Sequence, residues 1–460
     1  MPVETQERIE LGVGLKEIAV DVVDRAIKAG ATSADAIARD GNEFSTLVRL
    51  GEVETLKESG ARALGLRVFV GRHAAATHTS DFSREGIERL VSSAIALARA
   101  TSGDPDAGLP EASNLGSLKQ NLDLYYDDVY SLSTADRIEY ARRAEAAALS
   151  ADPRIINSEG GSFDAATGYK VLANSLGFVG EYRRSYCSVA AVPIARAEGS
   201  AMQRDYWYST SRTLQKLDSP EAVGRKAAER TLRRLGARKV TTQKVPVVFD
   251  PMVSRGLLDH MFDAVNGDAI YRHASYLAGK LGEQIAGDNI TIIDEGTMVG
   301  GFGSSPFDGE GVPTRRTVVI ERGILKSYLL NTYTARKLKL QTTGNAARGL
   351  TGNPGIGCGN FYLEPGNHSP HDILRDIRSG LYITEFLGFG VNLVTGDFSR
   401  GASGLWIEDG ELTFPVEEIT VAGNLKDMFR NVAAIGDDLE FRSSIAAPTL
   451  RIDGMTVAGE

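Results

Sequence analysis

Three polar side chains that could bind a metal stand close together near the middle of the chain: Asp259, His260 and Asp263. Apolar residues around them recur at steps of three and four, which predicts an amphipathic helix over 254–266. Carboxylate and imidazole groups are metal ligands, so these side chains, with His273 beyond the helix, could form a metal site. Their spacing matches no recognised set of zinc ligands, and we therefore favour a polar helix face with one hydrogen-bonded histidine.

Two further groups of reactive residues also have structural interpretations. His368 and His371 offer two imidazoles, but Ser369 between them is typical of a helix N-cap, which favours a capped helix over a metal site. The thiol of Cys358 could act as a nucleophile, yet no histidine lies close to it in sequence, so a buried free thiol is favoured. The glycines over 355–359 lack the strand and helix that flank a phosphate-binding loop.

A loop with charges of both signs, FDGEGVPTRR over 307–316, precedes a predicted hairpin. It carries Asp308, Glu310 and Arg315 within a few residues, and its glycines let the backbone come close to a partner. These charges are equally consistent with contact to an extended peptide or partner and with a surface turn that leads into the hairpin. The strands of the hairpin are expected at 317–321 and 324–330.

The composition excludes several classes of protein. At 460 residues, with 42% hydrophobic and 24% charged residues, the chain is long enough for two or three domains. A net charge of −9 argues against direct nucleic-acid binding, and we interpret the basic run over 225–239, interrupted by Glu229, as a solvated helix face. No apolar run approaches the roughly 18 residues of a membrane span, and no apolar core of a signal peptide follows the N-terminus. With two distant cysteines, these features indicate a cytoplasmic protein without membrane contact.

The predicted elements are those of an α+β protein. We place a domain boundary near 237–245, where an alanine-rich helix gives way to a strand. This gives an N-terminal domain over 1–240, with helices packed on an antiparallel sheet, and a strand-rich, barrel- or sandwich-like C-terminal domain over 241–460. The expected helices are 15–30, 83–100, 133–150, 219–235, 254–266, 332–338, 371–377 and 425–431. The expected N-terminal strands are 34–39, 44–49, 61–70, 74–79, 155–164, 167–173, 179–191 and 206–210.

A series of motifs begins at the charged loop and continues toward the C-terminus. After FDGEGVPTRR come SYLLNTYTARKL, TTGNA, GNFYLEPG, GLYITEFLGFGVNLVTGDFSRGASGLWIEDGEL and VAGNLKDMF. In this order they resemble the TldD/PmbA family of peptidase-complex subunits, over most of residues 250–445. The resemblance favours peptide or partner contact over a simple turn for the charged loop.

The resemblance also shows where this chain departs from the family's zinc-bearing branch. In the TldD branch, the helix corresponding to 257–267 carries His-Glu-x-x-x-His, which binds zinc, and a Cys is expected near the segment written here as GDFSRGAS. Here the helix reads LLDHMFDA, and 396–403 contains no Cys, His or Glu. The chain therefore resembles the PmbA branch, also called TldE. Its Asp259, His260 and Asp263 are degenerate metal-site positions, and no metal, cofactor or catalytic residue is expected in it.

This resemblance implies the non-catalytic subunit of a zinc metallopeptidase complex that degrades or processes unfolded peptides and leader peptides. Zinc is expected in a TldD-like partner, and the chain is expected to be inactive alone, where it could form a homodimer. The alternatives are a self-sufficient metallopeptidase with a rearranged metal site and a protein-binding modulator linked to DNA gyrase. We expect the backbone at 362–365 to pair with an extended substrate by strand addition. Peptide or partner contacts are expected at Asp308, Glu310, Arg315, Tyr362, Glu364 and Arg400.

Overall fold

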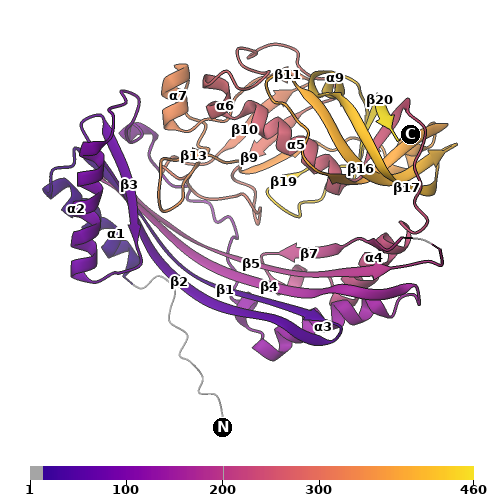
Figure 1. The fold of residues 1–460 in the computed structure, drawn as a ribbon. Coiled ribbons are helices and arrows are strands. Elements are labelled where there is room, and N and C mark those ends of the chain that lie inside the picture. Colours follow the sequence, from indigo (N-terminus) through magenta and orange to yellow (C-terminus); the bar gives the residue numbers. More distant parts are fainter. Residues whose placement is uncertain (1–13, 200, 460) are drawn as a thin grey trace, which may run out of the picture.

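The computed structural model describes residues 14–199 and 201–459. The N-terminal part of the chain is built on a seven-stranded antiparallel sheet whose long strands curve beneath the rest of the molecule (Figure 1). Its strand order is β3-β2-β1-β4-β5-β6, and β7 also pairs with β5. The strands are β1 (Ser33–Arg49), β2 (Glu52–Val70), β3 (His73–Thr79), β4 (Ile155–Asn174), β5 (Val179–Ala195), β6 (Gln203–Arg204) and β7 (Trp207–Ser211).

Two of these strands each replace two strands that the sequence predicted. Residues 33–49 form one strand, β1, and residues 155–174 form one strand, β4, where two strands each were expected. Gly41 of β1 lies opposite Gly168 of β4, and a Cβ atom on Gly41 would come within 2.8 Å of the carbonyl oxygen of Thr167. Glycine at this position permits close pairing of β1 and β4. The break that was expected between residues 39 and 44 is therefore absent.

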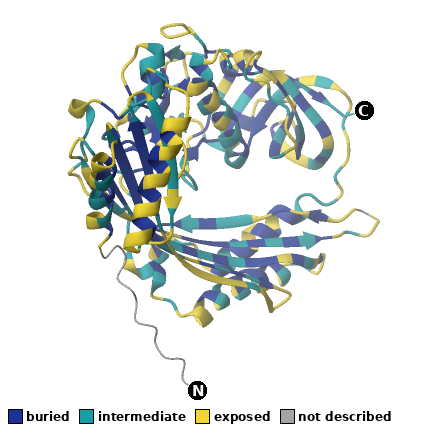
Figure 2. Ribbon diagram, turned by 60° about the vertical axis from the view of Figure 1, so that its left-hand side comes forward, coloured by how far each residue is buried: buried dark blue, intermediate teal, exposed yellow. Residues whose placement is uncertain are grey.

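Two pairs of helices cover the sheet at its two ends. α1 (Leu15–Lys28) and α2 (Arg84–Ala100) pack at one end, and α3 (Thr134–Leu149) and α4 (Pro220–Leu232) at the other. The strands beneath α1 and α2 are buried, whereas the outer sides of the helices are exposed (Figure 2). The predicted starts of three helices are confirmed, because a serine side chain accepts a backbone N–H at each. These N-caps are Ser83, Ser133 and Ser219.

The C-terminal part of the chain contains a closed five-stranded barrel, which confirms the barrel-like alternative. The strands follow the order β17-β16-β15-β8-β20, and pairing of β17 with β20 closes the ring. A second sheet has the order β11-β10-β9-β14-β19. The barrel strands are β8 (Gln243–Phe249), β15 (Ser379–Leu387), β16 (Asp397–Glu408), β17 (Glu411–Asn424) and β20 (Leu450–Ala458), with β18 (Val432–Ile435) beside β20. The strands of the second sheet are β9 (Ile292–Glu295), β10 (Arg316–Glu321), β11 (Ile324–Leu325), β14 (Asn360–Leu363) and β19 (Ile445–Ala446).

The helix α5 (Pro251–Val265) joins the barrel to the second sheet. It contacts β8 and β15 of the barrel and β14 and β19 of the sheet, and its apolar face belongs to the single large core of this part. The remaining helices are α6 (Gly267–Tyr271), α7 (Thr332–Leu338), α8 (Pro370–Leu374) and α9 (Leu425–Arg430). Within the described ranges, the chain has no helix with both the length and the hydrophobicity to cross a membrane.

The second strand of the predicted hairpin is shorter than expected. Only Ile324–Leu325 pairs with β10. The chain then turns toward the end of α5, where the backbone N–H of Leu329 donates to the carbonyl oxygen of Val265 at 3.1 Å. Leu329 is buried in the core around α5. The apolar run that suggested a strand thus reflects burial beside a helix, which a short run cannot distinguish.

Candidate functional site

The charged loop before β10 is folded around its own carboxylates. Asp308 and Glu310 are buried, with exposed fractions of 5% and 3%. Asp308 accepts backbone N–H groups from Glu310 (2.8 Å), Val312 (3.0 Å) and Ala346 (3.0 Å), and Glu310 accepts the N–H of Thr332 (2.9 Å). The alternative of a solvated surface turn is therefore wrong. The carboxylate oxygens of these two residues bind backbone N–H groups of the loop and of the start of α7. Contact of either residue with a peptide or partner stays a prediction.

A buried ionic network ties this loop region to the N-terminal sheet. Asp35 of β1 forms an ion pair with Arg67 of β2 at 2.6 Å and a second one with Arg348, and Arg67 also approaches Glu310 at 3.8 Å. Burial alone would raise the pKa of Asp35, but Arg348 and Arg67 outweigh it and lower that pKa. For Asp308, burial and then the carboxylate of Glu310 raise the pKa to about 7. The arginines of the network thus keep Asp35 ionised, whereas burial and Glu310 make protonation of Asp308 easier.

Cys358 lies near a second buried acid, Asp294 of β9. Burial raises the pKa of Asp294 to about 6, against hydrogen bonds donated by Asn345 at 2.7 Å and by the backbone of Gly359. Burial and then the charge of Asp294 raise the pKa of Cys358 to about 12. The interpretation of Cys358 as a free thiol is confirmed, although it is only partly buried. A thiol with such a pKa is not a nucleophile at neutral pH, because the thiolate is the reactive form.

Replacing Asp294 by asparagine is expected to remove part of the pH dependence of stability. The pKa is about 6 in the folded chain and about 3.9 in the unfolded chain. The folded state therefore binds more protons between these values, and its stability falls as the pH rises. Between pH 5 and pH 8 we expect the wild type to lose about 1 to 1.5 kcal/mol more than Asp294→Asn, measured by urea unfolding.

The exposed Asp288 provides the matched control for this measurement, since it precedes the same strand. Asp288→Asn should leave the pH dependence of the wild type unchanged. An equal loss of stability in Asp294→Asn and Asp288→Asn would contradict the expected linkage.

On α5, the candidate metal-site residues differ in their exposure to solvent. The helix begins at Asp250, whose side chain accepts the N–H of Met252 at 3.0 Å. Asp259 and Asp263 lie one turn apart on the exposed side. Although solvent reaches both, partial desolvation by the surrounding protein raises the pKa of each, and Asp259 raises that of Asp263 further. His260 lies toward the barrel instead.

His260 lies between an aromatic ring and a cation. Its ring meets the edge of Phe398 at 6.3 Å between centroids, and its Nε2 atom is buried without a hydrogen-bond partner among the described residues. Burial and then the charge of Arg400 lower the pKa of His260, so the imidazole is neutral at pH 7. Arg400 donates from Nη2 to the carbonyl oxygen of Gly388 at 2.8 Å and stacks over Phe386. The interpretation of a hydrogen-bonded histidine is thus not supported for Nε2.

These residues do not fit the zinc ion that the resemblance implies for the TldD branch. A catalytic zinc is held by three protein ligands, often with a carboxylate acting as the base. Here β16 places the ring of Phe398 and a cation, Arg400, near His260, and the cation repels a metal ion. In the part of the chain that the structure describes, no three His, Cys, Asp or Glu side chains converge into a ligand set. The imidazole and the two exposed carboxylates face different surroundings.

The other predicted contact residues lie elsewhere. Tyr362 of β14 meets the ring of Phe441, Glu364 approaches Arg316 at 3.5 Å, and Arg315 is exposed. β14 pairs with β9 along one edge and with β19 along the other. β19 pairs only with Phe361 and Tyr362, so strand addition is blocked at Tyr362 and stays a prediction for 363–365. Side-chain contact with a peptide or partner stays a prediction.

The two histidines around the start of α8 have the structural role that the sequence favoured. The Ser369 side chain accepts the N–H of Asp372 at 3.2 Å and caps the helix, which confirms the N-cap. His368 and His371 lie on either side of this cap, and His371 is exposed on α8. The predicted helix is shorter than expected, since α8 ends at Leu374.

Sequence reasoning missed an arginine cluster on α4. The basic run was interpreted as a solvated face, and this is wrong for Arg230, which is 5% exposed. Its guanidinium approaches Asp205 at 3.4 Å and Asp250 at 3.5 Å. The helical spacing contained the signal, because Arg230 follows the buried Val223 and Ala227 by seven and three positions.

Three family signatures match the chain in order. They are the PmbA/TldA metallopeptidase domain 1 over residues 34–98, the central domain over 127–235 and the C-terminal domain over 242–459. The chain is 41% identical over 417 residues to the metalloprotease PmbA of Escherichia coli, covering 91% of this chain and 90% of that protein. It is 37% identical over 446 residues to a PmbA homologue of Haemophilus influenzae, covering 97% and 96%.

Solved structures show the same architecture. A protein from Bacteroides thetaiotaomicron, described as a proposed modulator of DNA gyrase, matches with a TM-score of 0.90 and 32% identity over 97% of this chain and 99% of that one. TldE from Thermococcus kodakarensis matches with a TM-score of 0.86 over 96% and 100%, and at 20% identity this shows the fold alone. With its sequence relatives and all three signatures in place, the chain belongs to the PmbA/TldD metallopeptidase family.

Proposed function

We propose that this chain is the non-catalytic subunit of a zinc metallopeptidase complex, in which a TldD-like partner holds the zinc and cuts unfolded peptides and leader peptides. The observation that carries this proposal is the environment of His260 on α5. Arg400 lies close enough to lower the pKa of that histidine, and the neighbouring Asp259 and Asp263 are exposed to solvent. A cation beside the imidazole opposes a metal ion, so the chain's contribution is binding and alignment.

An exposed apolar loop beside Arg400 suits contact with the partner. The end of β15 and the loop that follows it carry Leu387, Phe389 and Val394, with exposed fractions of 47%, 105% and 57%. Arg400 binds the carbonyl oxygen of Gly388 in this loop, so the loop lies next to the candidate site. Clusters of exposed apolar side chains mark surfaces that bind other proteins. We therefore place the TldD-like partner on this loop.

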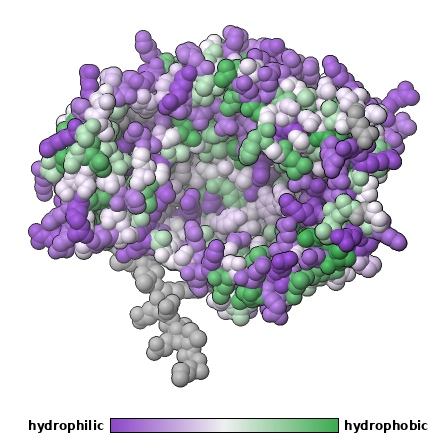
Figure 3. Space-filling model, in the orientation of Figure 1, coloured by the Kyte–Doolittle hydropathy of each residue, from purple (hydrophilic) through white to green (hydrophobic). Residues whose placement is uncertain are grey.

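The space between the sheet and the C-terminal part suits a peptide. The space-filling view shows a hollow on this face of the molecule (Figure 3). Arg255 of α5 reaches across to the sheet, where it donates to the hydroxyl of Tyr208 at 3.4 Å. Asp259 and Asp263 follow Arg255 by one and two turns and so look toward the same space. This places exposed carboxylates where an unfolded chain would pass.

We place this complex in the cytoplasm. The described cysteines, Cys187 and Cys358, are both free, as expected in a reducing compartment. The net charge of −9 supports binding to proteins and peptides more than direct binding to nucleic acid.

A cleavage assay with and without the partner tests the proposal. The purified chain alone is expected to leave an unfolded peptide intact, whereas its mixture with a TldD-like subunit cleaves the peptide until a chelator is added. His260→Gln should leave the activity of the mixture within about twofold, because this imidazole is not a zinc ligand. Chelator-sensitive cleavage by the chain alone, lost in His260→Gln, would overturn the proposal in favour of a self-sufficient enzyme.

A further inference from the structure

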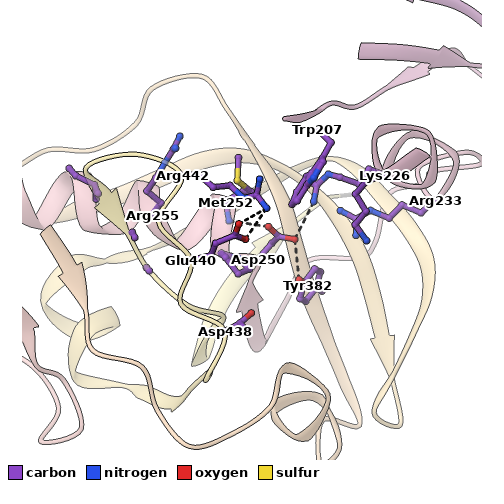
Figure 4. Close-up of a pocket in the computed structure, with 15 residues that line it drawn as sticks. Trp207, Lys226, Arg233, Asp250, Met252, Arg255, Tyr382, Asp438, Glu440 and Arg442 are labelled. Carbon is purple, nitrogen blue, oxygen red and sulfur yellow. Dashed lines mark hydrogen bonds and ion pairs between the residues drawn. The ribbon is translucent and has the colours of Figure 1, made fainter. Parts of the chain in front are cut away.

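A cavity of about 290 Å³ lies between α4, the first turn of α5 and the segment 438–447 (Figure 4). Five cationic side chains line it, together with three carboxylates. Lys226 and Arg233 lie on one side of the cavity and Arg255 and Arg442 on the other, with Asp250 and Tyr382 between them (Figure 4). Part of the wall is apolar. The apolar side chains are Met252, Ile445, Ala446 and Ala447.

Three of the five cations have acidic partners in contact. A guanidinium or ammonium group paired in this way has less capacity for a ligand. The pairs are Arg230 with Asp205 (3.4 Å) and Asp250 (3.5 Å), Arg442 with Glu440 (2.8 Å), and Lys226 with Glu229 (3.0 Å).

Arg233 differs from these three residues. Its Nε and Nη2 atoms are buried, and neither has a hydrogen-bond partner in the part of the chain that the structure describes. Burial and then repulsion from Arg230 lower the pKa of Arg233, as expected for a desolvated cation. Across the cavity, Arg255 makes one hydrogen bond to the described residues, a long one to the hydroxyl of Tyr208 at 3.4 Å. Buried donors without acceptors are costly, so an anion that accepts from Arg233 would be bound.

We propose that this cavity binds a carboxylate, with Arg233 as its main donor, and that the carboxylate is the C-terminal group of a peptide. The site itself stands on the geometry of the cavity, and only the peptide as its source rests on the proposed function. The cationic side chains are balanced by the lining carboxylates and by the neighbouring Asp205 and Glu229, which favours an anion of one charge over a doubly charged phosphate. The apolar wall suits the last side chain of the peptide.

The fluorescence of Trp207 reports binding at this place. Its ring stacks with the guanidinium of Arg442 at 4.3 Å and with that of Arg230 at 5.1 Å, so a ligand among these cations changes its surroundings. The purified chain is titrated with acetyl-trialanine carrying a free carboxylate, with its C-terminal amide and with inorganic phosphate. The free acid is expected to bind at least about tenfold more tightly than the amide and more tightly than phosphate. No partner is present, so a failure of partner-dependent cleavage leaves this result unaffected.

A comparison of Arg233→Met with Arg225→Met distinguishes binding in the cavity from attraction to the overall positive charge of this region. Both variants remove one positive charge, Arg225 from α4 and Arg233 from its C-cap, but Arg225 is exposed and does not line the cavity. Arg233→Met is expected to weaken binding of the free acid about tenfold or more, and Arg225→Met to leave it unchanged. The thermal midpoint should not fall in Arg233→Met, because two donor atoms of this side chain have no described partner to lose.

Three results would overturn the assignment. Equal affinity for the acid and the amide would exclude recognition of the carboxylate. Tighter binding of phosphate, lost in Arg233→Met, would replace the peptide by a free phosphate as the ligand. Equal weakening by Arg233→Met and Arg225→Met would show binding to the general charge of α4 and no built site.

Discussion

Asp35→Ala is expected to lower the free energy of unfolding by about 3 to 5 kcal/mol. The substitution leaves the guanidinium groups of Arg67 and Arg348, with side-chain exposures of 3% and 0%, without the carboxylate that pairs with both. Among the described residues, the acid left within ion-pair distance is Glu310, which is 3.8 Å from Arg67 and already accepts a backbone N–H. Two buried cations with one distant counterion are strongly unfavourable, because desolvation is no longer offset by pairing. Urea unfolding followed by circular dichroism measures the loss.

Asp24→Ala is the matched control, since Asp24 is an exposed aspartate on α1. Its effect should stay within about 0.5 kcal/mol, as for most surface substitutions. Asp35→Asn keeps hydrogen-bond acceptance without the charge and should fall between the two. If Asp35→Ala costs no more than Asp24→Ala, the network does not hold the loop region to the sheet.

The sequence predicted elements well where local rules decide them. Ser83, Ser133 and Ser219 begin helices because each satisfies a free backbone N–H, and this chemistry is complete within four residues. The break predicted near Gly41 was wrong for a non-local reason. The neighbour that makes glycine necessary there, Thr167, is far away in sequence.

The candidate site shows the same division between local and long-range information. The helix that carries Asp259, His260 and Asp263 was predicted from its apolar spacing, and α5 confirms it. The charge next to His260 was not predictable, because Arg400 reaches it from another strand. The burial of the loop carboxylates Asp308 and Glu310 was also not predicted. Loops rich in charge and glycine are usually exposed, but Asp308 satisfies three backbone N–H groups and is buried.

The cavity beside α4 depended most on tertiary structure. The spacing of Val223, Ala227 and Arg230 placed the arginine on the buried side, yet a charged residue at such a position is rare without partners. Those partners, Asp205 and Asp250, come from separate segments of the chain. Helical periodicity predicts which side of the helix a residue lies on, but only the tertiary structure shows which residues it contacts there.

Phe389→Ser is expected to weaken the complex with the TldD-like partner about 30- to 100-fold. Phe389 is fully exposed in the isolated chain, so removing its ring costs little in folding. If the partner covers it, the lost burial corresponds to about 2 to 3 kcal/mol, which is typical of an aromatic anchor. The dissociation constant, measured by isothermal titration calorimetry with the purified partner, should rise accordingly.

Leu56→Ser provides the comparison that makes this result specific to the loop. Leu56 is also an exposed apolar residue, at 49%, but it lies on β2 of the N-terminal sheet. Loss of affinity in Phe389→Ser alone assigns the partner to the loop beside Arg400, whereas equal affinities in both variants would remove the loop from the interface. If Phe389→Ser instead converts a dimer of the isolated chain into a monomer without affecting the partner, the apolar loop joins two copies of this chain. An exposed apolar cluster marks a surface that binds another protein, and this measurement identifies whether that protein is the TldD-like partner or a second copy of the chain.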